Sequence, residues 1–204
     1  MEYAFHMYNT LAETGIYLAL ERCLGTLEAP PVVLCIGSDL ALGDSLGPIA
    51  GTMLNSRKTR FCGYIYGTLR APVTAKEVKY LGEFVRKTHP ASKIIAVDAA
   101  VGEEEEIGLV KVIPSPLRPG AGANKRLPKV GDVSILGIVA KKSAIAYPLL
   151  HLTRLSAVYT MAEIVANALT SLSVRVESDN FVNKSQNIGN VVNLSNKKRA
   201  SVIL

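Results

Sequence analysis

The chain contains no tryptophan, and aromatic residues make up only 6% of its 204 residues. Side chains that stack on nucleic-acid bases are therefore scarce, and the basic residues behind the net charge of +6 are dispersed along the chain. This composition argues against a nucleic-acid-binding protein, which usually gathers its basic residues in one stripe. Hydrophobic residues, at 49%, are too abundant for a disordered chain.

Cysteines and long apolar runs are also few. Cys23, Cys35 and Cys62 are odd in number and widely spaced in apolar sequence, which is typical of reduced core thiols rather than disulfides or a zinc site. No apolar run approaches the roughly eighteen residues of a membrane span. The first residues lack a basic start followed by an apolar segment, so we expect no signal peptide and no membrane partner. The expected location is the cytoplasm.

The length fits one α/β domain covering residues 1–204. Short apolar runs predict strands at 32–36, 61–66, 93–98 and 133–140, and the alternating run 109–113 predicts a partly exposed or edge strand. Amphipathic or capped segments predict helices at 7–23, 46–54, 74–88 and 153–172. Thr74 and Glu77 match a capping box at the start of the third helix. This alternation predicts a mainly parallel sheet with crossover helices. Residues 173–204 are expected to be a mobile or strand-forming tail.

The stretch IGSDLALGDSLGP, residues 36–48, allows two interpretations. Ser45 could be the nucleophile of a Gly-Asp-Ser-Leu serine esterase, or Ser45 could cap a helix while Asp44 does the chemistry. The expected strand ends near Gly37, eight residues before Ser45, and neither His6, His89 nor His151 lies in an Asp-x-x-His pattern. A serine without an imidazole base is a weak nucleophile, so the esterase is the less favoured alternative.

Asp44 follows one apolar strand of the expected parallel sheet, and Asp98 ends another. The carboxyl ends of parallel strands meet at one edge, where such folds bind their ligands. Two carboxyl groups that meet there cannot both ionise cheaply, which leaves one acid and one base. Such a pair can activate water and polarise a peptide carbonyl. Alternatively, the two side chains only cap a loop and a helix, and spacing alone does not decide.

A third feature is the loop 117–128, rich in glycine, proline and basic residues. Gly120 and Gly122 would let the backbone approach a ligand closely. Arg118 or Lys125 could offer positive charge to a carbonyl oxygen or an acidic substrate. Many surface loops share this composition, so the pattern alone is weakly specific.

Together these segments resemble a known group. Gly37-Ser38, an acid six residues later and Leu46-Gly47-Pro48 resemble the start of the hydrogenase-maturation and germination proteases. Residues 97–99 resemble their second acidic strand end, and residues 118–126 are similar to the Pro-Gly-x-Gly-x-x-Asn-Lys-Arg loop of the germination protease. From residue 32 to about 162, including 68–72 and 152–156, the chain resembles the YyaC sporulation-protein family.

The resemblance implies a three-layer α/β/α fold of the phosphorylase/hydrolase-like type and a peptidase of spore-forming bacteria, acting in the forespore or spore core. It carries over Asp44 and Asp98 as the catalytic acids. The maturation proteases add a histidine to hold a metal, whereas this chain has Arg118 where the germination protease has histidine. We therefore expect no metal and no cofactor.

The sequence thus predicts an endopeptidase of sporulation or germination with Asp44 and Asp98 as its catalytic pair. Its partner would be a protein or peptide substrate, and homo-oligomer formation is left open. The expected substrate-binding residues are Arg70, Arg118, Gly120, Gly122, Asn124 and Lys125. The alternative is a catalytically inactive member of the fold that uses the same crevice to bind a peptide or protein.

Overall fold

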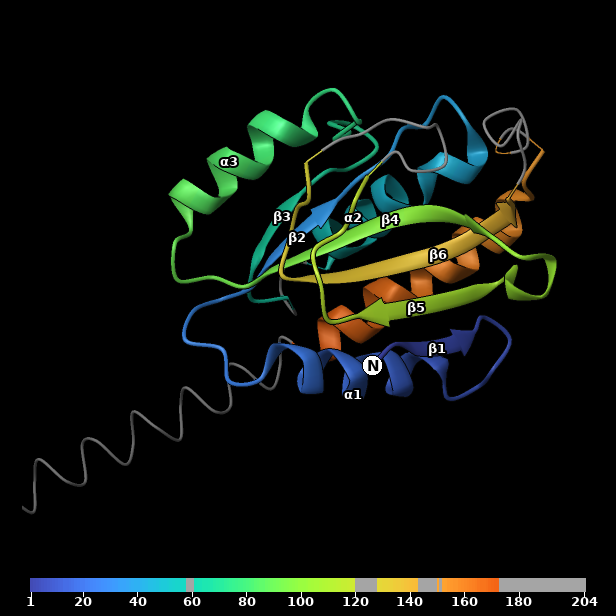
Figure 1. The fold of residues 1–204 in the computed structure, drawn as a ribbon, viewed down its shortest axis with the longest axis horizontal. Coiled ribbons are helices and arrows are strands. Elements are labelled where there is room, and N and C mark those ends of the chain that lie inside the picture. The colour runs from blue at the N-terminus through green and yellow to red at the C-terminus, as the bar shows by residue number, and fades with distance from the viewer. Residues whose placement is uncertain (58–60, 120–127, 143–149, 151, 173–204) are drawn as a thin grey trace, which may run out of the picture.

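The computed structural model describes residues 1–57, 61–119, 128–142, 150 and 152–172 (Figure 1). The expected tail, residues 173–204, lies outside the described residues. The strands are β1 (Tyr3–His6), β2 (Val32–Cys35), β3 (Tyr64–Tyr66), β4 (Ile94–Gly102), β5 (Leu109–Ile113) and β6 (Val133–Lys141). The helices are α1 (Ala12–Leu24), α2 (Leu46–Ser56), α3 (Val78–Thr88) and a helix over residues 155–172, with 3-10 turns η1 (Leu42–Ser45) and η2 (Glu104–Glu106).

The strands form one mixed sheet in the order β1-β5-β6-β4-β2-β3. The four strands from β6 to β3 are parallel, as their apolar runs predicted, whereas β5 is antiparallel to β6 and β1 is antiparallel to β5. The strand predicted at 109–113 is partly exposed, because buried and half-buried residues alternate along β5, but it is not an edge strand, because β1 pairs with its outer side through Tyr3 and Val112. The protein is therefore an α/β protein, and its sheet is extended by two antiparallel strands.

The order of winding reverses between β2 and β4. The chain passes from β2 through α2 to β3 on one side of β2, and then through α3 to β4 on the other side. In parallel α/β sheets, ligands bind at the carboxyl ends of the strands where the winding reverses. A ligand-binding site is therefore expected at this edge of the sheet.

Apolar side chains alternate between the two faces of the sheet. Val33, Ile95 and Val97 pack on the face covered by α1, α2 and the 155–172 helix, whereas Ile94 and Ala96 pack on the face covered by α3. Figure 1 shows α3 and α1 on opposite sides of the strands. Burial on both faces explains why these strands are apolar without alternating polar residues.

The 155–172 helix is long and apolar enough to cross a membrane by length and composition alone. Its inner face is nevertheless part of the core, because Val158, Met161, Val165 and Leu169 are fully buried. This burial is typical of the core helix of a soluble α/β domain.

The three cysteines form no disulfide with one another. Cys35 is buried on β2, and burial raises the pKa of its thiol to about 12. This thiol is therefore inert at neutral pH, as expected of a core cysteine.

The capping box expected at the third helix forms only in part, because the Glu77 N–H donates to the Thr74 carbonyl and not to its hydroxyl, and it does not start the helix. The Glu77 carboxylate accepts hydrogen bonds from the backbone N–H and the hydroxyl of Thr74, and the regular helix begins only at Val78. Residues 74–77 instead make a hydrogen-bonded turn that leads into α3. The predicted boundary was therefore four residues too early.

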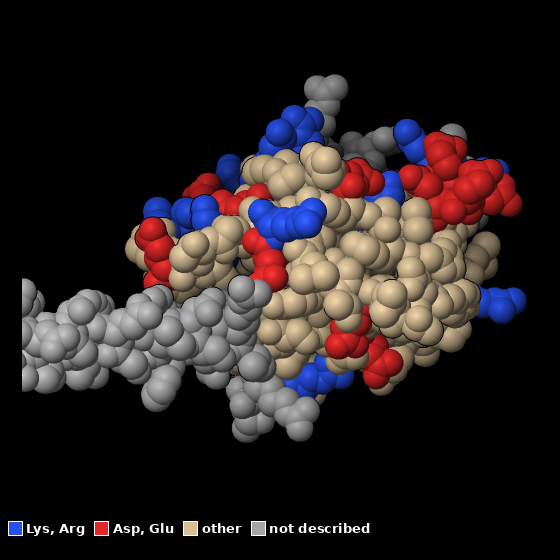
Figure 2. All heavy atoms as spheres, turned by 90° about the horizontal axis from the view of Figure 1, so that it is seen from below, with Lys and Arg blue, Asp and Glu red and all other residues tan. Residues whose placement is uncertain are grey.

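The charged side chains on the face shown in Figure 2 lie in separate groups, and acidic ones gather at the end that carries the turn between β4 and β5. That turn contains Glu104 and Glu106. The Lys111 ammonium lies 2.6 Å from the Glu106 carboxylate and 3.0 Å from that of Glu2, and Lys141 lies 2.7 Å from Glu104. These ion pairs balance much of the acidic charge of the turn.

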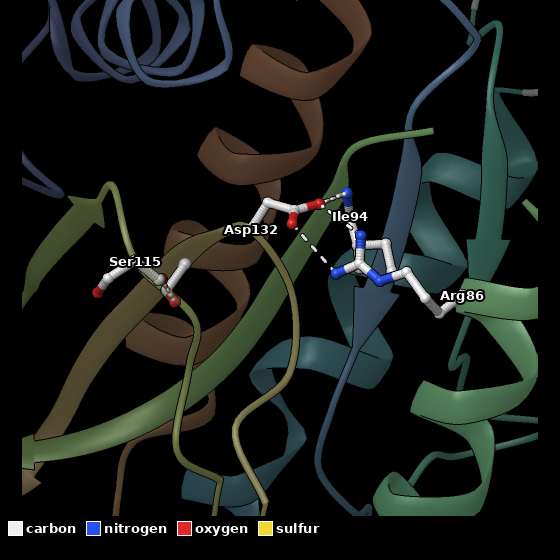
Figure 3. A network of polar contacts seen from close by, with 5 residues as sticks. Arg86, Ile94, Ser115 and Asp132 are labelled. Atoms are coloured by element: carbon white, nitrogen blue, oxygen red, sulfur yellow. Dashed lines mark hydrogen bonds and ion pairs between the residues drawn. The ribbon is translucent and has the colours of Figure 1, made fainter. Parts of the chain in front are cut away.

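Asp132 joins α3 to the amino-terminal ends of β4 and β6. Its carboxylate accepts a hydrogen bond of 2.8 Å from the Ile94 backbone N–H and two bonds, 3.1 and 3.2 Å long, from the Arg86 guanidinium. Figure 3 shows the dashed lines that join this carboxylate to Ile94 and to Arg86. Asp132 thus adds a polar link between α3 and the sheet to the apolar packing of Val78 and Val85.

We expect Asp132→Ala to destabilise the protein by about 1–3 kcal/mol, because the Ile94 N–H loses its acceptor. Arg86→Ala should cost only about 0–1 kcal/mol, because the ion pair is exposed to water. Urea unfolding of both variants at pH 7 measures the difference. Equal losses would show that the ion pair, and not the bond to the backbone, makes the contribution.

Candidate active site

Asp44 is positioned by the backbone that follows β2. The Ser38 N–H donates a 3.0 Å hydrogen bond to the Asp44 carbonyl, and the Asp44 N–H donates to the Ala41 carbonyl. A Cβ added at Gly47 would lie 2.1 Å from the Ile36 carbonyl oxygen, so the first turn of α2 lies directly against the end of β2. These contacts hold the half-buried Asp44 over the carboxyl edge of the sheet.

Asp98 does not end its strand as expected, because β4 continues to Gly102. The neighbouring strand β2 ends at Cys35, opposite Val97, and the Ile36 N–H still donates to the Val97 carbonyl at 2.7 Å. Asp98 is therefore the first residue of β4 beyond the end of β2, and it remains paired with Leu136 of β6 on the other side. Asp98 thus lies where the winding of the sheet reverses.

The structure brings the two aspartates into electrostatic contact. Asp98 is only 6% exposed, and burial followed by the negative charge of Asp44 raises its pKa well above the ordinary value of 3.8. A 2.9 Å hydrogen bond from the Ala99 N–H to its Oδ1 acts in the opposite direction but does not cancel this rise. η1, which carries Asp44, also contacts β4. The arrangement therefore favours a protonated Asp98 beside the carboxyl group of Asp44.

Such a pair offers two chemical functions in one place. A carboxylic acid can donate a hydrogen bond or a proton to a carbonyl oxygen, and a neighbouring carboxylate can accept a proton from water. A perturbed carboxyl group at the reversal point of a parallel sheet is also where a functional site is expected on physical grounds.

Of the other predicted site residues, the structure describes Arg70 and Arg118. Arg70 is exposed at the tip of a turn closed by the hydrogen bonds between Thr68 and Ala71. Arg118 is exposed beside Leu117, whose backbone pairs with Val130. The remaining members lie outside the described residues: Gly120, Gly122, Asn124 and Lys125.

Ser45 is arranged as a structural residue. It is only 4% exposed, and its hydroxyl donates a 2.6 Å hydrogen bond to the Leu42 carbonyl. It occupies the N-cap position of α2, but its side chain makes no capping hydrogen bond to that helix. The imidazole of His89 is engaged elsewhere, with the Tyr66 hydroxyl.

A metal site needs several side chains with donor atoms close together. Within the described residues, no three His, Cys, Asp or Glu side chains lie together in a way that could hold a metal ion. His151 and the loop 120–127 lie outside that set. The two aspartates alone make a poor divalent site, because two carboxylates leave most positions of such an ion to water.

Sequence analysis missed the apolar side chains around Asp44. Leu40 is 80% exposed and Leu42 is 39% exposed in the segment between β2 and α2. A Cβ at Gly43 would lie within 3 Å of side-chain atoms of Leu150 and Thr153, so η1 packs against the segment before the 155–172 helix. The presence of two leucines in this short loop was the sequence signal that could have predicted exposed apolar side chains near Asp44.

Two comparisons place the chain among known proteins. Residues 4–168 match the family model described as "Protein of unknown function (DUF1256)". The chain is also 44% identical, over 149 residues, to the Uncharacterized protein YyaC of Bacillus subtilis (strain 168). That alignment covers 72% of this chain and 71% of the relative. The chain described here belongs to the DUF1256 family.

Proposed function

We propose that this protein is a peptidase that hydrolyses peptide bonds with Asp44 and Asp98. The observation that supports the proposal most directly is the buried Asp98, whose pKa is raised by burial and by the charge of Asp44 at the carboxyl edge of the sheet. A carboxyl group buried beside a second acid costs folding free energy, and such costs are concentrated at functional sites.

In the proposed reaction, the Asp44 carboxylate accepts a proton from a water molecule, and the water oxygen attacks the carbonyl carbon of the scissile peptide bond. Asp98, as the carboxylic acid, donates its proton toward the carbonyl oxygen, so that a neutral tetrahedral diol forms. The proton held by Asp44 then passes to the peptide nitrogen while the C–N bond breaks. A hydroxyl proton of the diol returns to Asp98, which restores the starting state.

The finer fold assignment is part of the same proposal. Helices on both faces of the sheet are compatible with a three-layer α/β/α arrangement of the phosphorylase/hydrolase-like type. The substrate would be a protein or peptide of the forespore or spore core, reached in the cytoplasm. Leu40 and Leu42, exposed beside Asp44, would contact apolar parts of that substrate.

The proposal is tested by incubating the full chain with a peptide library prepared from spore extract and identifying new termini by mass spectrometry. We expect cleavage by the wild-type protein, and a loss of roughly 100- to 10,000-fold in the rate for Asp44→Asn, the range for removal of an acid or base. Asp39→Asn is the matched control, because Asp39 lies exposed in the same loop. An Asp44→Asn protein that cleaves as fast as the control would refute the catalytic pair.

Ser45→Ala separates the peptidase from the serine esterase. We expect it to retain the cleavage rate within about twofold, and to lose about 1 kcal/mol of stability, because the Leu42 carbonyl loses a hydrogen-bond donor. The checks are the same cleavage assay, urea unfolding, and labelling with a serine-reactive phosphonate. Phosphonate labelling of wild-type Ser45 together with loss of activity in the variant would support the esterase instead.

The second candidate is a catalytically inactive protein that binds a peptide in the same crevice. It is favoured by the exposed positions of Arg70 and Arg118. Among the described residues, the site then consists mainly of the two aspartates. Binding of peptides without any new termini, in wild type and Asp44→Asn alike, is the result that would select it.

A further inference from the structure

A cavity of about 800 Å³ lies between β3, the loop that follows β3, and α3. Most of the side chains at its wall are apolar or aromatic, and the main ones are Ile65, Tyr66, Val73, Tyr80, Leu81 and Phe84. The volume is large enough for a bulky side chain of a ligand. None of these residues takes part in the chemistry proposed above.

The aromatic wall of the cavity is held in place by contacts with His89. The Tyr66 hydroxyl lies 2.8 Å from His89 Nε2, and the Tyr64 ring stacks on the His89 ring at 3.9 Å between centroids. Phe84 meets Tyr66 edge to face at 6.3 Å. The cavity is therefore built in advance, and a ligand would not have to order it.

The cavity borders the last strand of the sheet within the described residues. The Tyr64 N–H donates to the Pro31 carbonyl on the β2 side, and backbone groups alternate in direction along a strand. The N–H and C=O of Ile65 therefore point away from β2, toward the open edge. An open edge of this kind is a template for a further strand.

Positive charge lies at the rim of the cavity. Lys76 lines it, and Arg70 lies in the Thr68–Ala71 turn, whose end residues also line it. The acidic lining residue Glu77 accepts hydrogen bonds from the N–H and hydroxyl of Thr74 and stays ionised. Together, Lys76, Arg70 and Glu77 leave a net charge of about +1 at the rim. The rim would therefore attract a negatively charged group on the ligand.

The cavity is joined to the aspartate pair by a short chain of contacts. The carbonyl of Val73, on the cavity wall, accepts a 3.0 Å hydrogen bond from the Gly37 N–H, and the next residue, Ser38, donates to the Asp44 carbonyl. Successive side chains of a strand point to opposite faces of the sheet, so Asp98 lies on the same face as Ile94 and Ala96. These two residues pack in one cluster with Val73, so Asp98 is on the Val73 face. A ligand in the cavity and Asp98 thus lie on one face of the sheet.

We infer that this cavity and the edge of β3 bind an extended peptide that adds to the sheet as a strand. One large apolar side chain of the peptide fills the cavity, and an acidic residue next to it pairs with Lys76 or Arg70. The peptide's role as a substrate rests on the proposed function, but its binding does not require the aspartates to react.

The test uses the full chain carrying Asp44→Asn, so that no peptide is cleaved. The probes are fluorescein-labelled peptides of eight residues, made of serine and threonine except at two positions. One position carries Leu, Ile, Met or Phe, and the next carries Glu, Ser or Lys. Binding is measured by fluorescence anisotropy. We expect binding of the peptides with Glu, at least threefold weaker binding of those with Lys, and at least tenfold weaker binding when the apolar residue becomes Ser. N-methylation at alternate backbone positions should weaken binding in one register only.

Ala71→Trp blocks the cavity from an exposed position, and Ala91→Trp, exposed in the turn after α3, is its control. We expect at least tenfold weaker binding for the first and less than twofold change for the second. A second matched pair is Phe84→Ala and Tyr159→Ala, because Phe84 is 52% exposed and Tyr159, on another helix, is 51% exposed. We expect at least tenfold weaker binding for Phe84→Ala and less than twofold change for Tyr159→Ala. Melting temperatures of the variants check their folding.

The inference is overturned if no peptide of the set binds, or if a blocked and a control variant bind equally well. It is also overturned if Ala71→Trp dissociates a dimer seen by sedimentation while no peptide binds, because the occupant is then a second copy of the chain. Specific peptide binding by a wild-type protein that cleaves nothing would instead refute the catalytic pair and leave this inference standing.

Discussion

Asp98→Asn is expected to abolish cleavage and, above about pH 4, to make the protein more stable than the wild type. The folded protein keeps Asp98 away from water and next to Asp44, which raises its pKa, whereas the unfolded chain has the ordinary pKa of 3.8. Asparagine has nearly the same shape, carries no charge, and can still accept the hydrogen bond from the Ala99 N–H. The substitution therefore removes a cost of folding together with the proposed catalytic acid.

The direction of the pH effect on stability follows from proton binding at Asp98. Between pH 3.8 and the raised pKa of Asp98, the folded state binds more protons at this site than the unfolded state does. Its contribution to the free energy of unfolding therefore falls as pH rises, by up to about 1.4 kcal/mol per pH unit, and is constant above the raised pKa. Below 3.8 the carboxyl group is protonated in both states and the cost disappears.

The measurement is the free energy of unfolding in urea for wild type and Asp98→Asn from pH 3 to pH 9. The difference between the two should grow from about pH 4 in favour of the variant and then level off at the raised pKa. Asp39→Asn, in an exposed position, should show no such growth. A difference that does not change with pH would show that Asp98 is not perturbed, and the proposed acid would lose its basis.

Gly37→Ala is expected to lower stability by about 2–4 kcal/mol and to reduce cleavage by at least tenfold. Gly37 has a φ of +137°, which side-chain-bearing residues rarely adopt, and an added Cβ would lie 2.0 Å from the Asp44 carbonyl oxygen. The loop that holds Asp44 would have to move by about an ångström. A shift of that size can cost a catalytic group much of its effect.

Gly25→Ala is the matched control for this substitution. Gly25 also has a positive φ, +64°, but nothing lies within 4 Å of an added Cβ. It should therefore lose about 1–2 kcal/mol from backbone strain and keep its cleavage rate. Urea unfolding and the cleavage assay are run on both variants, and equal effects on cleavage would show that the contact with Asp44 has no part in positioning it.

The parallel part of the fold could be predicted from the sequence because β2, β4 and β6 are buried on both faces and therefore read as continuous apolar runs. β1 was missed, because four residues with one apolar face give too little signal, and its partner β5 lies far along the chain. The start of α3 was misplaced, because the Thr74 and Glu77 side chains satisfy a turn as readily as a helix end.

The meeting of Asp44 and Asp98 could be predicted because parallel strands deliver their carboxyl ends to one edge. The burial of Asp98 could not, because it depends on β4 continuing beyond the end of β2. The cavity beside β3 could not be predicted from the sequence either. Its wall contains apolar residues such as Ile65 and Phe84, and apolar character alone does not distinguish a core position from the wall of a cavity.

The pairing of β1 with β5 has a consequence for synthesis of the protein on the ribosome. Tyr3 finds its partner Val112 only after more than half of the chain has been made, and α1 packs against both of these strands. Contacts so distant along the chain form late, because closing a long loop costs entropy before any bond repays it. The first residues to be translated are therefore among the last to reach their native place.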